Sequence, residues 1–181
     1  TEWTGSINDR SWFTSPRYEK YRQPGNVKLS FWLQPKKHYV GPAWYARDVR
    51  IPEAWSGKRV ALFLERCHWE TTVWVDGELV GLNDSLSTPH IFEATDHLAA
   101  GDHRITVRVD NRMIVNVGPN AHSVTDHTQS NWNGITGRIE LRATDPVWID
   151  DVQVFPKADA GSAEVKVTVG NATGKSGQGT L

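Results

Sequence analysis

The feature that most constrains the fold is a pair of short apolar-rich segments joined by two residues that favour reversal of the chain. Asp76 and Gly77 lie between Thr71–Val75 and Glu78–Gly81. An Asp-Gly pair is typical of a type I′ turn, because both central residues of that turn need a positive φ. The segment therefore predicts an antiparallel β-hairpin and favours a fold built from antiparallel sheets.

Further strand-like segments precede and follow this hairpin. Arg59–Glu65 is apolar at successive positions, which predicts a central strand buried on both faces. Arg104–Val109 alternates apolar and polar residues after a turn at Gly101-Asp102, which predicts a half-buried strand. Because helical periodicity is almost absent, the pattern predicts an all-β sandwich or jelly roll. Shorter elements are expected at Trp44–Ile51, His90–Ala94, Arg138–Leu141 and, as one helical turn, Thr95–Ala99.

A change of pattern near Asp145-Pro146 predicts a domain boundary. Beyond it lie two strand-like segments, Val147–Phe155 and Ala163–Val169. A glycine-rich segment follows the second one. Two strands bury too little apolar surface to form a stable core alone. We therefore expect residues 1–145 to form one domain and residues 146–181 to begin a second β domain that is truncated here.

Bulk composition excludes several classes of function. The 20 Lys and Arg residues nearly balance the 21 Asp and Glu residues, and the formal net charge is -1. Without a basic excess or a run of like charges, neither a nucleic acid nor a membrane surface is an expected partner. No apolar stretch approaches the roughly 20 residues of a membrane span. Met113 is the only methionine and Cys67 the only cysteine, so we expect a processed chain or part of a longer one, without an internal disulfide.

Tryptophan is unusually frequent, with nine residues in this chain of 181. An indole ring stacks on the C–H face of a sugar and offers one N–H donor, so carbohydrate-binding proteins use it often. It also fills the cores of β-sandwiches. Trp69 and Trp74 lie inside strand patterns and are expected to be structural, whereas Trp132 lies in a polar loop. The aromatic-rich residues 1–40 predict a long ordered loop pinned across the sandwich.

Five segments together resemble the N-terminal sugar-binding domain of glycoside hydrolase family 2, which includes β-galactosidases, β-glucuronidases and β-mannosidases. The family often has an arginine where Gly137 stands in this chain, and here Arg138 comes one residue later. The resemblance implies a galactose-binding-like jelly-roll sandwich over residues 1–145, followed by the first strands of an immunoglobulin-like sandwich. The segments are Tyr39–Arg47, Ile51–Val60, the hairpin of Leu64–Gly81, Arg104–Asn111 and Asn131–Ile139.

The resemblance also implies that catalysis and part of the sugar binding are carried out by different domains of a longer enzyme. In this family both catalytic glutamates lie on a later TIM barrel, which needs about 250 residues. We therefore expect no catalytic residue, metal or cofactor in this chain. Its expected partners are the barrel and remaining domains of a β-galactosidase-like enzyme, and a terminal β-linked sugar whose pocket it helps to form. Many members of the family are exported, so a periplasmic or secreted parent protein is expected.

A long polar loop, residues 120–133, is the best candidate for sugar contacts. Carboxylate and amide oxygens accept hydrogen bonds from sugar hydroxyls, amide and imidazole N–H groups donate them, and an indole face stacks. The resemblance implies that this loop supplies an acidic residue to the substrate pocket, and that a second loop, residues 36–39, approaches the substrate. Alternatively, the loops hold turn-forming Asp and Asn residues and a solvated basic turn. The candidate contacts are Asp126, Trp132, His127, Asn131 and His38.

Other groups of polar residues predict neither a metal site nor a nucleophile with its base. His122, Asp126 and His127 do not have the spacing of a recognised metal site. Cys67 is expected to be a small buried residue, because adjacent strand residues point to opposite faces and it cannot pair with His68 as a nucleophile with its base.

Three rival functions are compatible with the sequence. A free-standing carbohydrate-binding module predicts an exposed aromatic platform, and a structural module of a surface protein predicts no sugar dependence. A small complete glycosidase would need two carboxylates across a cleft, for which Glu65 and Glu70 are the only suggestion. We expect these two glutamates to face different directions or to pair with Arg66.

Overall fold

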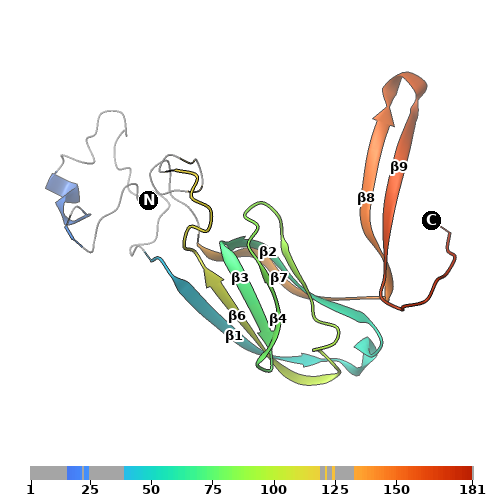
Figure 1. The fold of residues 1–181 in the computed structure, drawn as a ribbon, viewed down its shortest axis with the longest axis horizontal. Coiled ribbons are helices and arrows are strands. Elements are labelled where there is room, and N and C mark those ends of the chain that lie inside the picture. The colour runs from blue at the N-terminus through green and yellow to red at the C-terminus, as the bar shows by residue number, and fades with distance from the viewer. Residues whose placement is uncertain are drawn as a thin grey trace.

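The computed structural model describes residues 16–21, 23–24, 39–118, 121, 124 and 133–180 (Figure 1). Most of the aromatic-rich region expected to form a long ordered loop therefore lies outside the described residues. Within them the only helices are short 3₁₀ turns, and none is long and apolar enough to cross a membrane. These turns are η1 (Pro16–Tyr21), η2 (Glu53–Trp55) and η3 (Ala158–Ala160).

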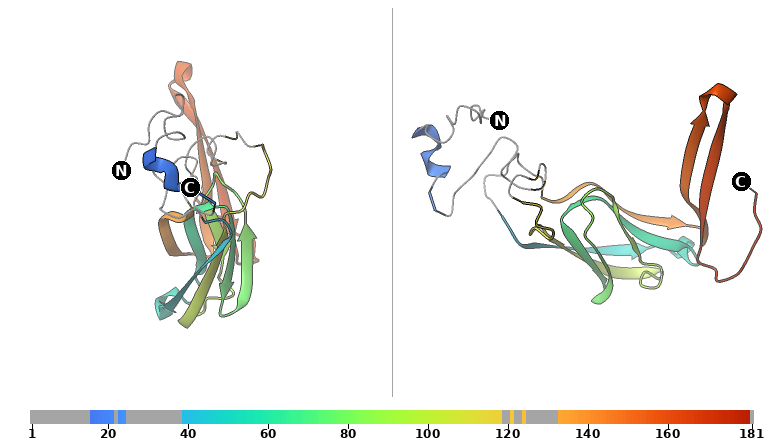
Figure 2. Two further views of the ribbon diagram at one scale, coloured as in Figure 1. Left: turned by 90° about the vertical axis from the view of Figure 1, so that its left-hand side faces the viewer. Right: turned by 45° about the horizontal axis from the view of Figure 1, so that its top comes forward.

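Antiparallel pairing joins the described strands into three sheets, which confirms the all-β prediction. The first sheet has the order β1-β6-β3-β4, the second β5-β2-β7, and the third is the hairpin β8-β9. The first two sheets pack face to face as the two layers of a jelly-roll-like sandwich (Figures 1 and 2). The strands are β1 (Pro42–Ile51), β2 (Arg59–His68), β3 (Glu70–Val75), β4 (Glu78–Asn83), β5 (His90–Glu93), β6 (Gly101–Asp110), β7 (Gly134–Thr144), β8 (Val147–Lys157) and β9 (Ser162–Asn171).

The central strand predicted from its continuous apolar run is β2, which lies between β5 and β7. Leu62 and Leu64 of β2 lie in the core between the two layers. Phe63 is also buried, and its ring is covered by the guanidinium groups of Arg142 and Arg138, whose Cζ atoms lie 3.3 and 5.2 Å from the ring centroid. Both faces of this strand are therefore buried, as predicted.

The hairpin predicted from Asp76-Gly77 joins β3 to β4. Asp76 has a φ of 51° and Gly77 a φ of 89°, so both central residues adopt the positive φ that the turn requires. Val75 and Glu78 lie opposite each other on either side of the turn.

Several boundaries differ from the sequence prediction. β7 begins at Gly134, four residues before the predicted start at Arg138, because β2 continues through His68 and pairs with these extra residues. The pairing crosses a β-bulge between Leu64 and Arg66. The length of β7 thus depends on a partner strand distant in sequence, which local alternation does not reveal.

One local prediction is wrong in detail, because Gly101 does not form a turn but begins β6, where it lies opposite Ile51 of β1. The single helical turn predicted at Thr95–Ala99 is present. The N–H groups of His97 and Leu98 both donate to the carbonyl of Ala94, and the turn does not extend into a helix.

The two strands predicted beyond Asp145-Pro146 form the β8-β9 hairpin. This hairpin projects away from the sandwich at the end where β7 finishes (Figures 1 and 2). Its apolar side chains have no covering layer in the described part of the chain. The largest exposed ones are Val147, Ile149, Val152, Val154, Phe155, Val165 and Val169.

An ion pair between Asp76 and His103 links the β3-β4 turn to β6. His103 Nδ1 lies 2.6 Å from an Asp76 carboxylate oxygen, and His103 Nε2 lies 2.8 Å from the carbonyl of Ala99. Because both ring nitrogens face acceptors, both carry protons in the imidazolium form. The hydrogen bond with Asp76 raises the pKa of His103, and the backbone N–H of Arg104, followed by His103, lowers the pKa of Asp76.

This pair predicts a defined pH dependence of stability. Stability from His103 is complete below its usual pKa of 6.5 and is lost as the pH rises through its raised folded pKa. Stability from Asp76 is complete above its usual 3.8 and is lost as the pH falls through its lowered folded pKa. In urea unfolding at a series of pH values, the stability lost on His103→Gln should be largest between pH 3.8 and pH 6.5. It should become smaller as the pH rises above 6.5.

Asp76→Asn is the matched control for this prediction, because its amide oxygen still accepts the Arg104 N–H while the charge is gone. In that background, the effect of His103→Gln should depend on pH less strongly, because only the Ala99 carbonyl and the charge of Asp102 still raise the pKa of His103. An unchanged pH profile in the double variant would contradict the assignment of the ion pair.

Candidate functional site

The side chain of Asn111 connects three chain segments at one end of the sandwich. Its Oδ1 accepts the backbone N–H of Gly41 at 2.7 Å. Its Nδ2 donates to the carbonyl of Tyr39 and to Oδ1 of Asn133, each at 2.7 Å. The residue just beyond β6 thereby fixes the entry to β1 and the entry to β7 in one place.

His68, at the end of β2, extends this network. Its Nδ1 lies 3.2 Å from the same Oδ1 of Asn133. Since that oxygen is an acceptor, the contact assigns a proton to Nδ1. The His68 side chain is largely buried, at 7% exposure, so the ring is held in a fixed orientation.

Gly134 and Tyr45 complete the floor of the site. Gly134 follows Asn133 with a φ of 77°, and a Cβ atom placed there would lie 2.6 Å from the Tyr45 hydroxyl oxygen. Glycine is favoured because other residues rarely adopt this φ, and a Cβ would in addition displace the hydroxyl end of the exposed Tyr45 side chain.

These residues line a small open hollow of about 140 Å³. Ligand pockets usually hold about 300–1,000 Å³, so the hollow corresponds to one part of a pocket rather than to a complete one. Its polar groups are two amides, two phenols and an imidazole, which match the hydrogen-bonding needs of sugar hydroxyls. The lining residues are Tyr39, Gly41, Ala43, Tyr45, His68, Val109, Asn111, Asn133 and Gly134.

The five sequence-predicted contacts, His38, Asp126, His127, Asn131 and Trp132, all lie outside the described residues. Their described neighbours nevertheless lie together. Tyr39 directly follows His38, Asn133 directly follows Trp132, and Asn111 hydrogen-bonds to both. The two predicted loops therefore begin or end at the same hollow.

Sequence reasoning missed Asn111, His68 and Tyr45 as parts of this site. The available signal was the polar ending of a strand at Asp110-Asn111 and a histidine inside a buried strand. Neither pattern points to a site without the pairing that places both residues at the same end of the sandwich.

The described structure opposes a catalytic role for Glu65 and Glu70. Glu65 accepts hydrogen bonds from the backbone N–H and Nε of Arg138, at 2.9 and 3.0 Å, and these bonds lower its pKa. Glu70 is paired with Arg108 at 2.5 Å. Each glutamate is thus hydrogen-bonded to an arginine other than Arg66, whose charge acts on Glu65 without a direct contact. A general acid needs a raised pKa, which the pairing of Glu65 opposes.

Cys67 is 1% exposed and part of the core, and burial raises the pKa of its thiol, as expected of a structural residue. Among the described residues no group of acidic, histidine and cysteine side chains is arranged to hold a metal ion. His122, Asp126 and His127 are outside those residues.

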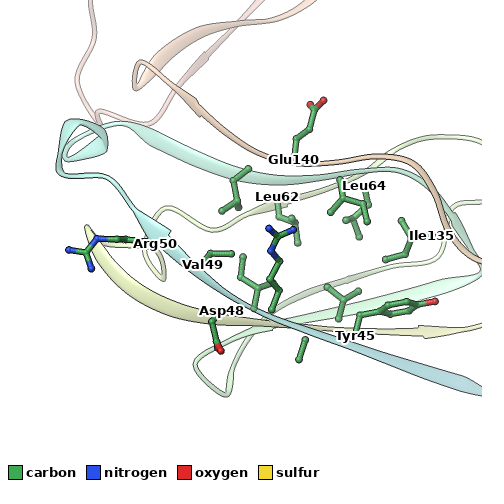
Figure 3. A pocket seen from close by; sticks show the side chains of 14 residues that line it. Tyr45, Asp48, Val49, Arg50, Leu62, Leu64, Ile135 and Glu140 are labelled. Atoms are coloured by element: carbon green, nitrogen blue, oxygen red, sulfur yellow. The ribbon is translucent and has the colours of Figure 1, made fainter.

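A larger cavity, of about 540 Å³, lies between β1 and β7 at the open side of the sandwich (Figure 3). Leu62, Leu64 and Ile135 point into it, whereas the carboxylates of Asp48 and Glu140 point away (Figure 3). A sugar needs several convergent polar groups, so this cavity is the open side of the core rather than a sugar site.

Comparisons with known proteins agree with the geometry. The family model described as "Glycosyl hydrolases family 2, sugar binding domain" matches residues 5–146. A β-galactosidase from Thermoanaerobacter pseudethanolicus is 29% identical over 136 residues, covering 74% of this chain and 18% of the relative. A β-glucuronidase from Rattus norvegicus is 24% identical over 145 residues, covering 68% of this chain and 22% of the relative.

Solved structures show the same fold. A glycosyl hydrolase family 2 member from Bacteroides cellulosilyticus superimposes with a TM-score of 0.60 at 23% identity, covering 75% of this chain and 18% of that one. The class defined by fold and site is a β-sandwich sugar-binding domain. The chain belongs to glycoside hydrolase family 2, and it spans only 18% and 22% of the length of the two relatives named above.

The Gly134–Tyr45 contact generates a test with a matched control. Gly134→Ala should lower the free energy of unfolding by about 1–3 kcal/mol, because it adds displacement of the Tyr45 hydroxyl to an unfavourable φ. Gly57 has nearly the same φ, 76°, with nothing within 4 Å of its hypothetical Cβ, so Gly57→Ala should cost only the strain, about 1 kcal/mol. Chemical unfolding measures both, and equal costs would contradict the role of Tyr45.

The Asn111 bridge generates a second test. Asn111→Asp keeps the shape but replaces two donated hydrogen bonds by a carboxylate facing two oxygens, so it should destabilise the chain by about 1–3 kcal/mol. The control is Asn116→Asp, because Asn116 Oδ1 only accepts, from the N–H of Gly118 at 3.0 Å. Thermal unfolding compares the two, and an equally small effect at both sites would show that Asn111 does not hold the site together.

Proposed function

We propose that this chain is the non-catalytic N-terminal region of a β-galactosidase-like member of family 2, and that it forms part of the pocket wall for a terminal β-linked sugar. Hydrolysis takes place on a TIM-barrel domain of the same polypeptide, to which this chain contributes no catalytic residue. Asp126 and Trp132 are the leading sugar contacts, and His127, Asn131 and His38 are secondary ones.

The observation that carries this proposal is the junction at Asn111. It brings the described ends of both polar loops to one hollow, at an end of a family 2 sugar-binding domain. The hollow is smaller than a complete ligand pocket, which supports a pocket that a second domain completes. The pairing of Glu65 and Glu70 with arginines supports the absence of a catalytic pair in the described residues.

We further propose that residues 146–181 are the first strands of an immunoglobulin-like domain, with residues 1–145 as the jelly-roll domain. The β8-β9 hairpin stands apart from the sandwich and leaves its apolar side chains exposed. An isolated two-stranded hairpin is marginally stable in water, which supports completion of this sheet by further strands.

The decisive experiment measures hydrolysis by the longer polypeptide that carries this chain. With nitrophenyl β-galactoside, β-glucuronide and β-mannoside as substrates, Asp126→Asn should lower kcat/KM by about tenfold to a thousandfold, because a hydrogen-bonded carboxylate partner of the sugar is lost. Trp132→Ala should mainly raise KM, since stacking binds ground state and transition state alike.

Asp96→Asn is the matched control, because Asp96 is exposed on the turn after β5, away from the Asn111 junction. It should leave kcat/KM unchanged. If Asp126→Asn matches this control on every substrate, the contact assigned to Asp126 is wrong. If the unaltered polypeptide hydrolyses none of the three substrates, the β-galactosidase-like assignment is wrong.

A further inference from the structure

The tryptophan near the start of the β8-β9 hairpin is covered, unlike the apolar side chains beside it. Trp148 is half-buried, whereas Val147 and Ile149 are exposed. The indole packs directly on Gly170, its partner on β9, where a Cβ atom would overlap the ring. Its Nε1 donates to Oδ1 of Asp150 at 2.9 Å. These contacts fix the orientation of the ring within its own hairpin.

An arginine of the sandwich also covers this ring. Arg59 is the first residue of β2, and its Cζ lies 4.0 Å from the centroid of the Trp148 ring. A guanidinium at this distance is attracted by the negative charge density on the face of an indole. Trp148 therefore takes part in a contact between the sandwich and the hairpin, which otherwise projects away from it (Figure 2).

Arg59 is held in place by Glu93 of β5. Its Nε donates to one carboxylate oxygen of Glu93 at 3.0 Å, and its Nη2 donates to the other. Two parallel hydrogen bonds to a carboxylate define the plane of a guanidinium. The side chain of Arg59 is only 12% exposed, so it has little freedom to leave the ring of Trp148.

The segment between the sandwich and the hairpin is short. β7 ends at Thr144 and β8 begins at Val147, so only Asp145 and Pro146 lie between them. Lys58 Nζ lies 2.6 Å from Oδ1 of Asp145, which ties this segment to the residue before β2. Two residues limit the distance between the two sheets but leave the angle between them to other contacts. The only contact of this kind that a side chain of β8 makes with the sandwich, among the interactions described above, is that of Trp148 with Arg59.

A crevice of about 350 Å³ lies beside this joint. Its charged side chains are already paired, Lys58 with Asp145 and Arg59 with Glu93. A bound sugar or anion needs polar groups that converge on it, so the crevice is better explained as the gap between two adjoining parts than as a ligand site.

We propose that Arg59 is a clamp that sets the angle between the sandwich and the β8-β9 hairpin. Trp148 is its contact on the hairpin, and Glu93 is its support on the sandwich. Relative motion of two joined parts is the default when their interface is small. The clamp restricts this motion through one oriented side chain.

The clamp is separate from the proposed sugar contacts. β7 runs from Gly134, beside the Asn111 junction, to Thr144, which lies opposite Arg59. The two sites therefore lie at opposite ends of the same strand. A substitution at Arg59 should leave the hollow at the Asn111 junction unchanged.

Residual dipolar couplings of backbone amides in the 181-residue chain test the clamp. In the unaltered chain, the couplings of the sandwich and of the hairpin should fit one common alignment. In Arg59→Gln the alignment of the hairpin should become at least about twofold weaker than that of the sandwich, because the hairpin then reorients about Asp145-Pro146.

Trp148→Val gives a second variant that leaves Arg59, Glu93 and the sandwich unaltered. It removes the ring but keeps a residue suited to a strand, and it should weaken the alignment of the hairpin as Arg59→Gln does. The matched control is Lys166→Gln. Lys166 Nζ lies 5.1 Å from the centroid of the Phe155 ring within the same hairpin, so its loss should leave the common alignment intact.

Three outcomes overturn the proposal. Separate alignments in the unaltered chain mean that no clamp holds the hairpin. A common alignment in both Arg59→Gln and Trp148→Val means that the short connecting segment alone sets the angle. Equal weakening in Lys166→Gln means that any change in the hairpin has this effect.

Nuclear Overhauser contacts between Val152 and Val167 distinguish reorientation of the hairpin from its unfolding, because these residues lie opposite each other on β8 and β9. Persistence of these contacts together with weakened alignment supports the clamp. Their loss in Arg59→Gln and Trp148→Val overturns it in favour of a contact that only stabilises the hairpin.

Discussion

Burial of β2 on both of its faces is the constraint on which the rest of the structure depends. One face of this strand supplies Leu62 and Leu64 to the core between the sheets, and the other holds Phe63 beneath two arginines. Full burial of one such apolar side chain stabilises a fold by about 1.5–3 kcal/mol. Because both arginines lie on β7, the pairing of β2 with β7, and with it the start of β7 at the site, is part of this burial.

The site is built where several strands finish at the same end of this sandwich. His68 ends β2, Asn111 follows β6, and Asn133 precedes β7, so the chain supplies polar side chains at points where backbone pairing stops. The hydrogen bonds among them replace ladder bonds that the strand ends lack. A rigid scaffold thus positions loops whose own sequence is rich in turn-forming residues.

The sequence predicted features that depend on neighbouring residues better than features that depend on residues far apart in the chain. The Asp76-Gly77 hairpin and the strand β2 are encoded by residues adjacent in sequence, and both predictions were confirmed. The early start of β7 and the pairing of Glu65 with Arg138 depend on register between strands some seventy residues apart, which local pattern does not contain. The polar loops were recognised by composition, but the asparagine that joins their ends was not, since a single Asn at the end of a strand is common.

The Asn111 junction has a consequence for how such a domain changes over time. Its amide contacts the flanks of two loops that lie far apart in sequence, and residues that share a hydrogen-bond network show non-additive effects when they are altered. A change of length or composition in one loop shifts the anchor of the other. Changes in the two loops are therefore expected to occur together in related proteins. Selection for a new sugar then acts on the pair of loops and not on either loop alone.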